Sequence, residues 1–182
     1  EGGVLMLHAS PEPAMSLHAP NCYVHGVTTC PDLNVTVEGY DVHDAWVLAI
    51  FPTEAAPRVT GVTLSWSYPP AIVVTSIDGC GQSEFPYEGW PASGTGTTIG
   101  WNTAQTSRIL EVMGLQAYCY SGEAGQIVLA EHHPYPPRFV DDSIPGVYDN
   151  AADVGKLGFN TPGYRVCPDD LGNGACCMPD GT

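Results

Sequence analysis

The sequence predicts an all-β fold, a β-sandwich of the jelly-roll or immunoglobulin-like kind. First, apolar and polar residues alternate over short stretches, as they do on strands that bury one face. Second, 17 prolines and 21 glycines separate these stretches and supply turns. Third, seven or more such stretches follow one another at the spacing of an all-β domain. Apart from the segment 108–120, no stretch has a convincing helical period.

The strand candidates can be justified in chain order. The segment 46–51 is apolar on both faces, which is typical of a central strand. The segment 62–68 alternates strictly and is stopped by Pro69 and Pro70. The segment 108–120 is long enough for a helix, but Gly114, Tyr118 and Tyr120 favour a bent strand. The full set of candidates after the N-terminal segment is 34–38, 46–51, 62–68, 71–77, 97–102, 108–120 and 126–132.

The chain divides into three parts in this interpretation. Residues 1–20 form an N-terminal extended segment, and 21–168 form the sandwich. From about residue 134 the alternation stops, and we expect a long, loop-rich wrap that packs on the sandwich. Residues 169–182 form a Cys-rich tail. The division predicts one domain with a sizeable core and two appendages.

The N-terminal segment carries a run of β-forming residues, Val4, Leu5, Met6 and Leu7. This run either pairs with its own sheet or is donated as a strand to a neighbouring subunit, because backbone pairing at a sheet edge gives strong association. The second alternative makes the run an assembly element.

The charge balance excludes several partners. Twenty acidic and five basic residues give a formal net charge of −15. Such a chain has no basic patch for nucleic acid, and an anionic membrane would repel it. The longest wholly apolar run, 45–51, is too short to insert into a membrane. Charged residues are only 14% of the chain and apolar ones 43%, so the chain is not an acidic disordered tail.

The cysteines indicate an oxidising compartment. No C-x-x-C pair is present, which argues against a zinc site or a redox motif. We favour a disulfide between Cys22 and Cys30, with Cys80 joined to Cys119 or Cys167, although spacing alone leaves the connectivity open. The odd count leads us to expect an eighth cysteine beyond Thr182; the alternative is one free or intermolecular cysteine. All seven, as disulfide candidates, are Cys22, Cys30, Cys80, Cys119, Cys167, Cys176 and Cys177.

The beginning of the chain fits a secreted protein. Glu1-Gly2-Gly3 is not a signal peptide, so we expect a mature chain whose signal has been removed. Asn34-Val35-Thr36 has the form of an N-glycosylation site, which makes Asn34 a candidate for modification.

Calcium is the best candidate among metals, although no cofactor is required. Every acidic residue after Glu131 is an aspartate, and short oxygen ligands in loops suit a hard cation. The alternative is a set of turn aspartates that only solubilise the loops. The candidate ligands are Asp141, Asp142, Asp149 and Asp153.

Carbohydrate is a second candidate ligand. Trp90 lies in the turn-rich stretch 87–91 and is the best exposed aromatic residue for stacking on a sugar. Hydrolysis is less well supported: no G-x-S-x-G elbow is present, and no pair of glutamates stands out as catalytic.

Several short motifs together resemble those of a group of uncharacterised secreted β-rich proteins of environmental bacteria. The motifs are Gly2-Gly3-Val4-Leu5-Met6-Leu7-His8-Ala9, Gly79-Cys80-Gly81, Gly89-Trp90-Pro91, Gly94-Thr95-Gly96, Phe139-Val140-Asp141-Asp142-Ser143-Ile144-Pro145, Leu157-Gly158-Phe159 and Pro162-Gly163-Tyr164 before Cys167-Pro168. Tails in this group often continue into CC-x-P-D-G-type cysteine repeats similar to 175–181. The resemblance implies an extracellular location and no known activity, and Cys119 is an addition to the pattern.

These observations lead to one functional hypothesis. We expect a secreted structural or adhesive protein rather than an enzyme, a subunit of an extracellular filament or surface assembly. Self-association through N-terminal strand complementation is the expected mechanism. A carbohydrate-binding β-sandwich module is the alternative, and a secreted hydrolase comes third.

Overall fold

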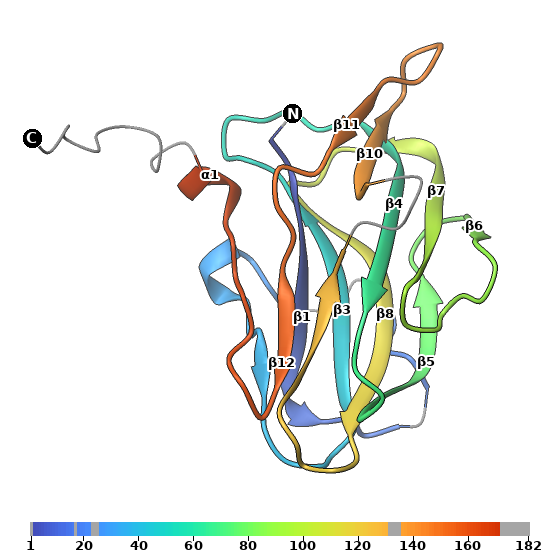
Figure 1. The fold of residues 1–182 in the computed structure, drawn as a ribbon. Coiled ribbons are helices and arrows are strands. Elements are labelled where there is room, and N and C mark those ends of the chain that lie inside the picture. Colours follow the sequence, from blue (N-terminus) through green and yellow to red (C-terminus); the bar gives the residue numbers. More distant parts are fainter. Residues whose placement is uncertain (1, 17, 23–25, 131–135, 172–182) are drawn as a thin grey trace, which may run out of the picture.

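The protein is a sandwich of two β-sheets packed face to face (Figure 1). The computed structural model describes residues 2–16, 18–22, 26–130 and 136–171. The first sheet, sheet A, contains β1 (Val4–Pro13), β3 (His43–Ile50), β8 (Ile109–Cys119) and β5 (Ile72–Gly79) in that spatial order, all antiparallel. This arrangement confirms the predicted all-β sandwich.

The second sheet, sheet B, is centred on one strand that pairs along both of its edges. Its strands are β2 (Thr36–Val37), β4 (Val59–Ser67), β6 (Ser83–Pro86), β7 (Thr95–Gln105), β9 (Gly125–Leu129), β10 (Arg138–Asp141), β11 (Tyr148–Asn150) and β12 (Lys156–Phe159). The central strand β4 pairs with β7 on one side and with β9 and β10 on the other. Beyond these, β6 extends β7, β11 extends β10, and β12 with β2 extends β9.

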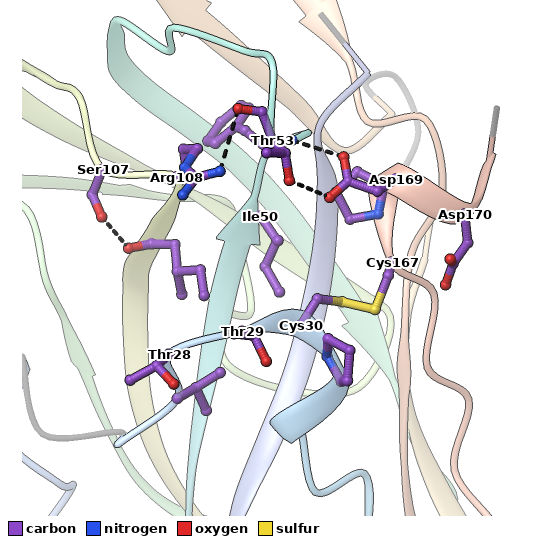
Figure 2. Close-up of a pocket in the computed structure, with 15 residues that line it drawn as sticks. Thr28, Thr29, Cys30, Ile50, Thr53, Ser107, Arg108, Cys167, Asp169 and Asp170 are labelled. Carbon is purple, nitrogen blue, oxygen red and sulfur yellow. Dashed lines mark hydrogen bonds between the residues drawn. A yellow bond between two sulfur atoms is a disulfide. The ribbon is translucent and has the colours of Figure 1, made fainter.

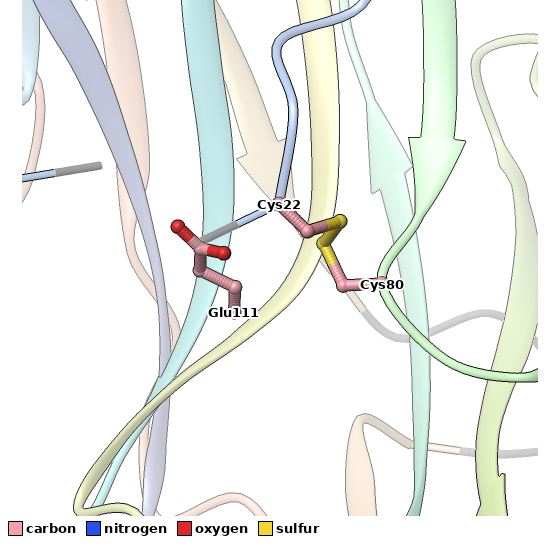
Figure 3. A group of neighbouring side chains, drawn as sticks. All are labelled: Cys22, Cys80 and Glu111. Atoms are coloured by element: carbon pink, nitrogen blue, oxygen red, sulfur yellow. A yellow bond between two sulfur atoms is a disulfide. The ribbon is translucent and has the colours of Figure 1, made fainter. Parts of the chain in front are cut away.

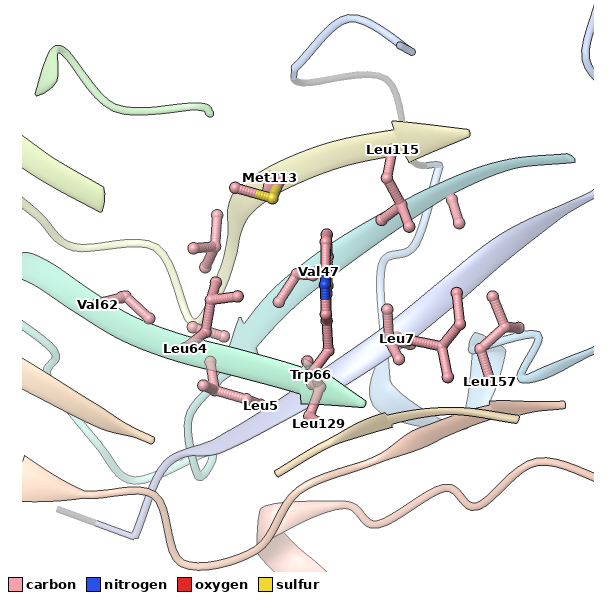
Figure 4. Packing of buried hydrophobic residues seen from close by; sticks show 14 of the residues in the cluster. Leu5, Leu7, Val47, Val62, Leu64, Trp66, Met113, Leu115, Leu129 and Leu157 are labelled. Atoms are coloured by element: carbon pink, nitrogen blue, oxygen red, sulfur yellow. The ribbon is translucent and has the colours of Figure 1, made fainter. Parts of the chain in front are cut away.

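The interior between the sheets is filled by the alternating apolar residues of both (Figure 4). Leu64 and Trp66 point inward from β4, and Val47 and Leu115 meet them from sheet A. The indole nitrogen of Trp66 donates a hydrogen bond to the carbonyl oxygen of Pro91 at 2.9 Å, so this buried ring leaves no polar atom unpaired. The strands predicted from alternation therefore form the core.

Of the two alternatives for the N-terminal segment, the structure shows pairing with its own sheet, and the expectation of strand donation is wrong. β1 pairs antiparallel with β3 of the same chain, from Val4 opposite Ile50 to Ala9 opposite Ala45. Its other edge is also engaged, because Leu5 N–H donates to the carbonyl oxygen of Asp153 at 3.2 Å. The side chains of all four predicted assembly residues are fully buried: Val4, Leu5, Met6 and Leu7. Burial on both faces holds this strand in its own sheet.

The region after residue 134 is more regular than predicted. The wrap contributes β10, β11 and β12 to sheet B, and Phe139, Leu157 and Phe159 are buried in the core. These strands are only three or four residues long. Alternation cannot be recognised over so few residues, because a period of two needs several repeats to stand out.

The disulfide pairing also differs from the prediction. Cys22 is bonded to Cys80 and Cys30 to Cys167, with Cα–Cα distances of 5.6 and 5.7 Å. The favoured Cys22–Cys30 bond is therefore wrong, as are both partners expected for Cys80. Cys119 is a buried free thiol at the end of β8. Cys176 and Cys177 lie outside the described residues.

The helices are short. A 3-10 helix spans Cys30–Asp32, and α1 spans Pro168–Leu171. No helix in the described ranges has the length and apolar character that crossing a membrane would require.

Candidate functional site

A segment between β1 and β2 covers the outer face of sheet A. We call the described residues of this segment, 14–16, 18–22 and 26–35, the strap. On the sheet, Trp46, Leu48 and Ile50 of β3 point outward, and Val27 and Leu33 of the strap pack against this outward-facing cluster. Because these side chains bury one another, the sandwich has a second, smaller core on its outside.

Close contacts show how tightly the strap lies on the sheet. A Cβ atom on Gly114 of β8 would lie 2.5 Å from the carbonyl oxygen of Pro20, so only glycine leaves room for the strap to pass. The indole nitrogen of Trp46 donates to the carbonyl oxygen of Asn21 at 3.4 Å. Gly114, which suggested a bent strand in the sequence, is therefore the position at which the strap crosses β8.

Polar side chains buried beneath the strap fix its position. Gln116 is fully buried, and its Nε2 donates to the carbonyl oxygen of Ser16 and to Asp44 Oδ1, both at 2.8 Å. At the other side, Nδ1 of His8 accepts the backbone N–H of Asn34 at 3.0 Å. Buried polar groups are stable only when they are hydrogen-bonded, so these contacts define one position for the strap.

Both disulfides among the described residues join the strap to distant parts of the chain. Cys22 ties it to Cys80 after β5, and Cys30 ties it to Cys167 before α1. Figure 3 shows the first disulfide beside the buried carboxylate of Glu111. The sulfur atoms and a carboxylate oxygen lie within 4.8 Å of one another, and this is the one group of potential metal ligands of its kind among the described residues. Its two sulfur atoms are bonded to each other, so they are not available as thiolate ligands.

A cavity of about 580 Å³ lies where the strap, sheet A and α1 meet (Figure 2). Ile50 and the Cys30–Cys167 disulfide supply apolar walls. At its mouth Asp169 accepts hydrogen bonds from the hydroxyl and the backbone N–H of Thr53, both at 2.7 Å. Both bonds lower the pKa of Asp169, and the bond from the Thr53 hydroxyl has the larger effect. Arg108 donates to the carbonyl oxygen of Thr53 at 3.3 Å.

The polar groups of this cavity thus bond mainly to one another. Its lining contains no histidine and no thiol outside a disulfide. Hydroxyl groups and one guanidinium beside an aspartate can orient a polar ligand, but they do not form a nucleophile with a base within reach.

Three of the four predicted calcium ligands, Asp141, Asp142 and Asp149, line one pocket. Among the described residues, however, the four carboxylates form no cluster at metal-ligand spacing. Asp142 forms an ion pair with Arg58, and Asp141 accepts three hydrogen bonds within its own loop. Both sets of contacts lower the pKa of these carboxyl groups. Asp153 accepts a hydrogen bond from the hydroxyl of Tyr164 at 3.0 Å, and Asp149 is half-buried on β11. The geometry gives the calcium prediction no support.

A chelator is therefore expected to leave the melting temperature unchanged. A native-state ligand adds stability by mass action, so its removal must lower the melting temperature. The measurement is thermal unfolding with EDTA and with added CaCl2 or MgCl2 at equal ionic strength. A fall on chelation that Ca²⁺ but not Mg²⁺ restores would contradict this expectation and establish a calcium site.

The two other predicted sites also have structural partners. The ring of Trp90 stacks on Trp66 with centroids 4.4 Å apart, so it packs against the core instead of standing free as a platform for sugars. Nδ2 of Asn34, where a glycan would be attached, donates to the carbonyl oxygen of Ala9 at 3.2 Å. Glycosylation of Asn34 stays a prediction, and the exposure expected for Trp90 is wrong because its ring is half-buried.

Several solved structures resemble the chain over most of its length. A chain of a CaDoc0917–CaCohA2 complex has a TM-score of 0.54 and 11% identity, with 88% of this chain and 99% of that chain covered. A type II cohesin domain from the cellulosome of Acetivibrio cellulolyticus has a TM-score of 0.54 and 8% identity, with 87% and 95% covered. The sixth cohesin of scaffoldin B from the same organism, solved in complex with a Cel5 dockerin mutant, has a TM-score of 0.52 and 14% identity, with 89% and 100% covered.

The chain has a cohesin-like fold. No family model and no curated protein matches it, so the likeness is one of architecture. The two disulfides are typical of an extracellular or cell-surface protein, in agreement with the expected location.

One exposed feature of this cohesin-like sandwich was missed in the sequence. The side chains of Ile144, Val147 and Tyr148 project from the hairpin between β10 and β11. A lone isoleucine between Ser143 and Pro145 was the available signal, because an apolar side chain in a turn-rich loop has no core to enter.

Proposed function

We propose that the chain is a non-catalytic protein-binding module of an extracellular or cell-surface assembly. The observation that carries the proposal is the cohesin-like fold over almost the whole length of a chain from a CaDoc0917–CaCohA2 complex. A cohesin of the same architecture is solved in complex with a dockerin. Because one fold hosts many functions, the proposal also needs support from this chain's own surface.

The surface supports docking of a different protein over self-association. Copies of a chain with a net charge of −15 repel one another. The strand expected to join subunits is buried in its own sheet. Assembly by N-terminal strand complementation is therefore not part of the proposal, and the self-associating filament gives way to docking of a different protein.

The proposal predicts a monomer that forms a one-to-one complex. The full chain, carrying an affinity tag, is cross-linked to neighbouring proteins on the surface of the source cells. Each cross-linked protein is then purified and titrated against the chain by calorimetry, while light scattering gives the mass of the free chain. We expect a saturable complex with at least one of them, with a dissociation constant in the micromolar range or tighter.

Two results would overturn the proposal. One is a free chain that forms polymers at micromolar concentration in physiological salt. The other is the failure of every purified cross-linked protein to bind saturably.

A further inference from the structure

The hairpin of β10 and β11 extends beyond the end of the sandwich (Figure 1). Residues 142–147 connect the two strands, and we call them, with Tyr148, the hairpin tip. The side chain of Ile144 is 99% exposed, and those of Val147 and Tyr148 are 53% and 57% exposed. Single exposed apolar residues are common, but three within five residues on a projecting loop mark an interaction surface.

A single carboxylate holds the conformation of the tip. Oδ1 of Asp141 accepts the backbone N–H groups of Ser143 at 3.0 Å and Val147 at 2.8 Å, and Oδ2 accepts the Ser143 hydroxyl at 2.8 Å. The Asp141 N–H donates back to the carbonyl oxygen of Val147 at 3.1 Å. A loop closed in this way has less conformational entropy to lose when its apolar side chains are buried by a partner.

Further contacts attach the hairpin to the sandwich. Asp142 forms an ion pair with Arg58, and the Arg138 guanidinium lies 4.4 Å from the centroid of the Tyr148 ring. Phe139 of β10 packs against Phe51 with ring centroids 5.0 Å apart. Of the three exposed apolar side chains, only that of Tyr148 takes part in these contacts, so the hairpin is attached to the core without Ile144 or Val147.

Charge selects the kind of partner. Both cations near the hairpin, Arg58 and Arg138, are already in contact with groups of this chain. Three carboxylates lie on the hairpin, those of Asp141, Asp142 and Asp149, and the whole chain is strongly acidic. A second copy and an anionic membrane would both meet like charge, whereas a basic protein surface would be attracted.

We propose that the hairpin tip is the docking element of this module and that Ile144 enters an apolar socket with a Lys- and Arg-rich rim on the partner protein. This inference rests on the proposed function and names the surface that performs it. The tip lies away from the strap, so docking leaves the cover of sheet A in place.

The test uses the partner protein purified in the cross-linking experiment and the full chain. Ile144→Asp places a charge in the socket and is expected to weaken binding at least about thirtyfold. Asp141→Ala releases the loop without touching the socket and is expected to weaken binding about fivefold to tenfold. Met15→Asp is the matched control, because Met15 is also 99% exposed and lies in the strap. It is expected to change affinity less than twofold.

The outcomes separate this inference from the proposed function. If the partner binds the wild type and Ile144→Asp equally well, the docking element lies elsewhere and the function stands. If no cross-linked protein binds the wild type, the function itself fails. Dimerisation of the wild type, or its binding to phosphatidylcholine vesicles, that is lost in Ile144→Asp would replace the protein partner by a second copy or a membrane and overturn the inference.

Discussion

Removal of residues 1–13 is expected to leave a chain that does not fold. This deletion removes β1, whose Val4, Leu5, Met6 and Leu7 side chains are fully buried. Burying one such side chain contributes about 1.5–3 kcal/mol, so four contribute roughly 6–12 kcal/mol. A domain of this size is stable by only about 5–15 kcal/mol. Circular dichroism and near-ultraviolet spectra of the truncated chain measure the loss.

The same deletion separates the two alternatives for the N-terminal segment. If β1 were donated to a neighbour, truncation would leave a soluble, folded monomer; such a result would contradict the pairing with β3. A synthetic peptide of residues 1–13 is expected to restore folding in trans. As a milder variant, Leu5→Ala is expected to cost about 2–5 kcal/mol. Met15→Ala, at an exposed position, is the control and is expected to cost less than about 0.5 kcal/mol.

Loss of the Cys30–Cys167 disulfide is expected to destabilise the protein more than loss of Cys22–Cys80. The bonds join residues 137 and 58 positions apart. In the chain-entropy account, closing loops of these lengths contributes about 5 and about 4 kcal/mol respectively. Each pair is replaced by serines, and urea unfolding under non-reducing conditions gives the free energy of unfolding. We expect losses of about 3–5 kcal/mol, with the larger loss for Cys30 and Cys167.

A control is available in the same chain. Cys119 is buried but free, and its sulfur already lies 3.1 Å from the carbonyl oxygen of Glu123. Cys119→Ser is therefore expected to cost only about 1 kcal/mol, because the hydroxyl can donate to the same oxygen. Peptide mapping without reduction checks the pairing directly. A peptide containing a Cys22–Cys30 bond would contradict the structure.

The disulfides also explain why the strap remains closed over sheet A. The strap covers an apolar face that includes Trp46 and Leu48. Its two cysteines are bonded to two segments that lie far apart in the sequence, one after β5 and one before α1. Without these bonds the strap would be held only by its apolar and polar contacts. The part of the outer face of sheet A that the strap covers is thus buried in the folded chain.

The strands were predictable from the sequence, whereas the partners of the polar side chains were not. The alternation of 62–68 predicted β4 because a period of two is a local property of the chain. The aspartates after residue 131 suggested calcium because of their type alone. In the structure Asp141 organises a loop and Asp142 pairs with Arg58, 84 positions earlier in the chain. Such partners are set by through-space contacts that the residue types do not encode.

By itself, the sequence determined the all-β sandwich, because strand alternation can be read from neighbouring residues. The exclusion of nucleic acid rests on the net charge alone and stays a prediction. The tertiary structure decided which strand pairs with β1, which cysteines are bonded and which apolar side chains stay outside. Each of these depends on segments that are distant in sequence and adjacent in space, as Gly114 shows where Pro20 crosses it. Loop closure and packing select those neighbours, and both act between segments that meet only as the chain folds.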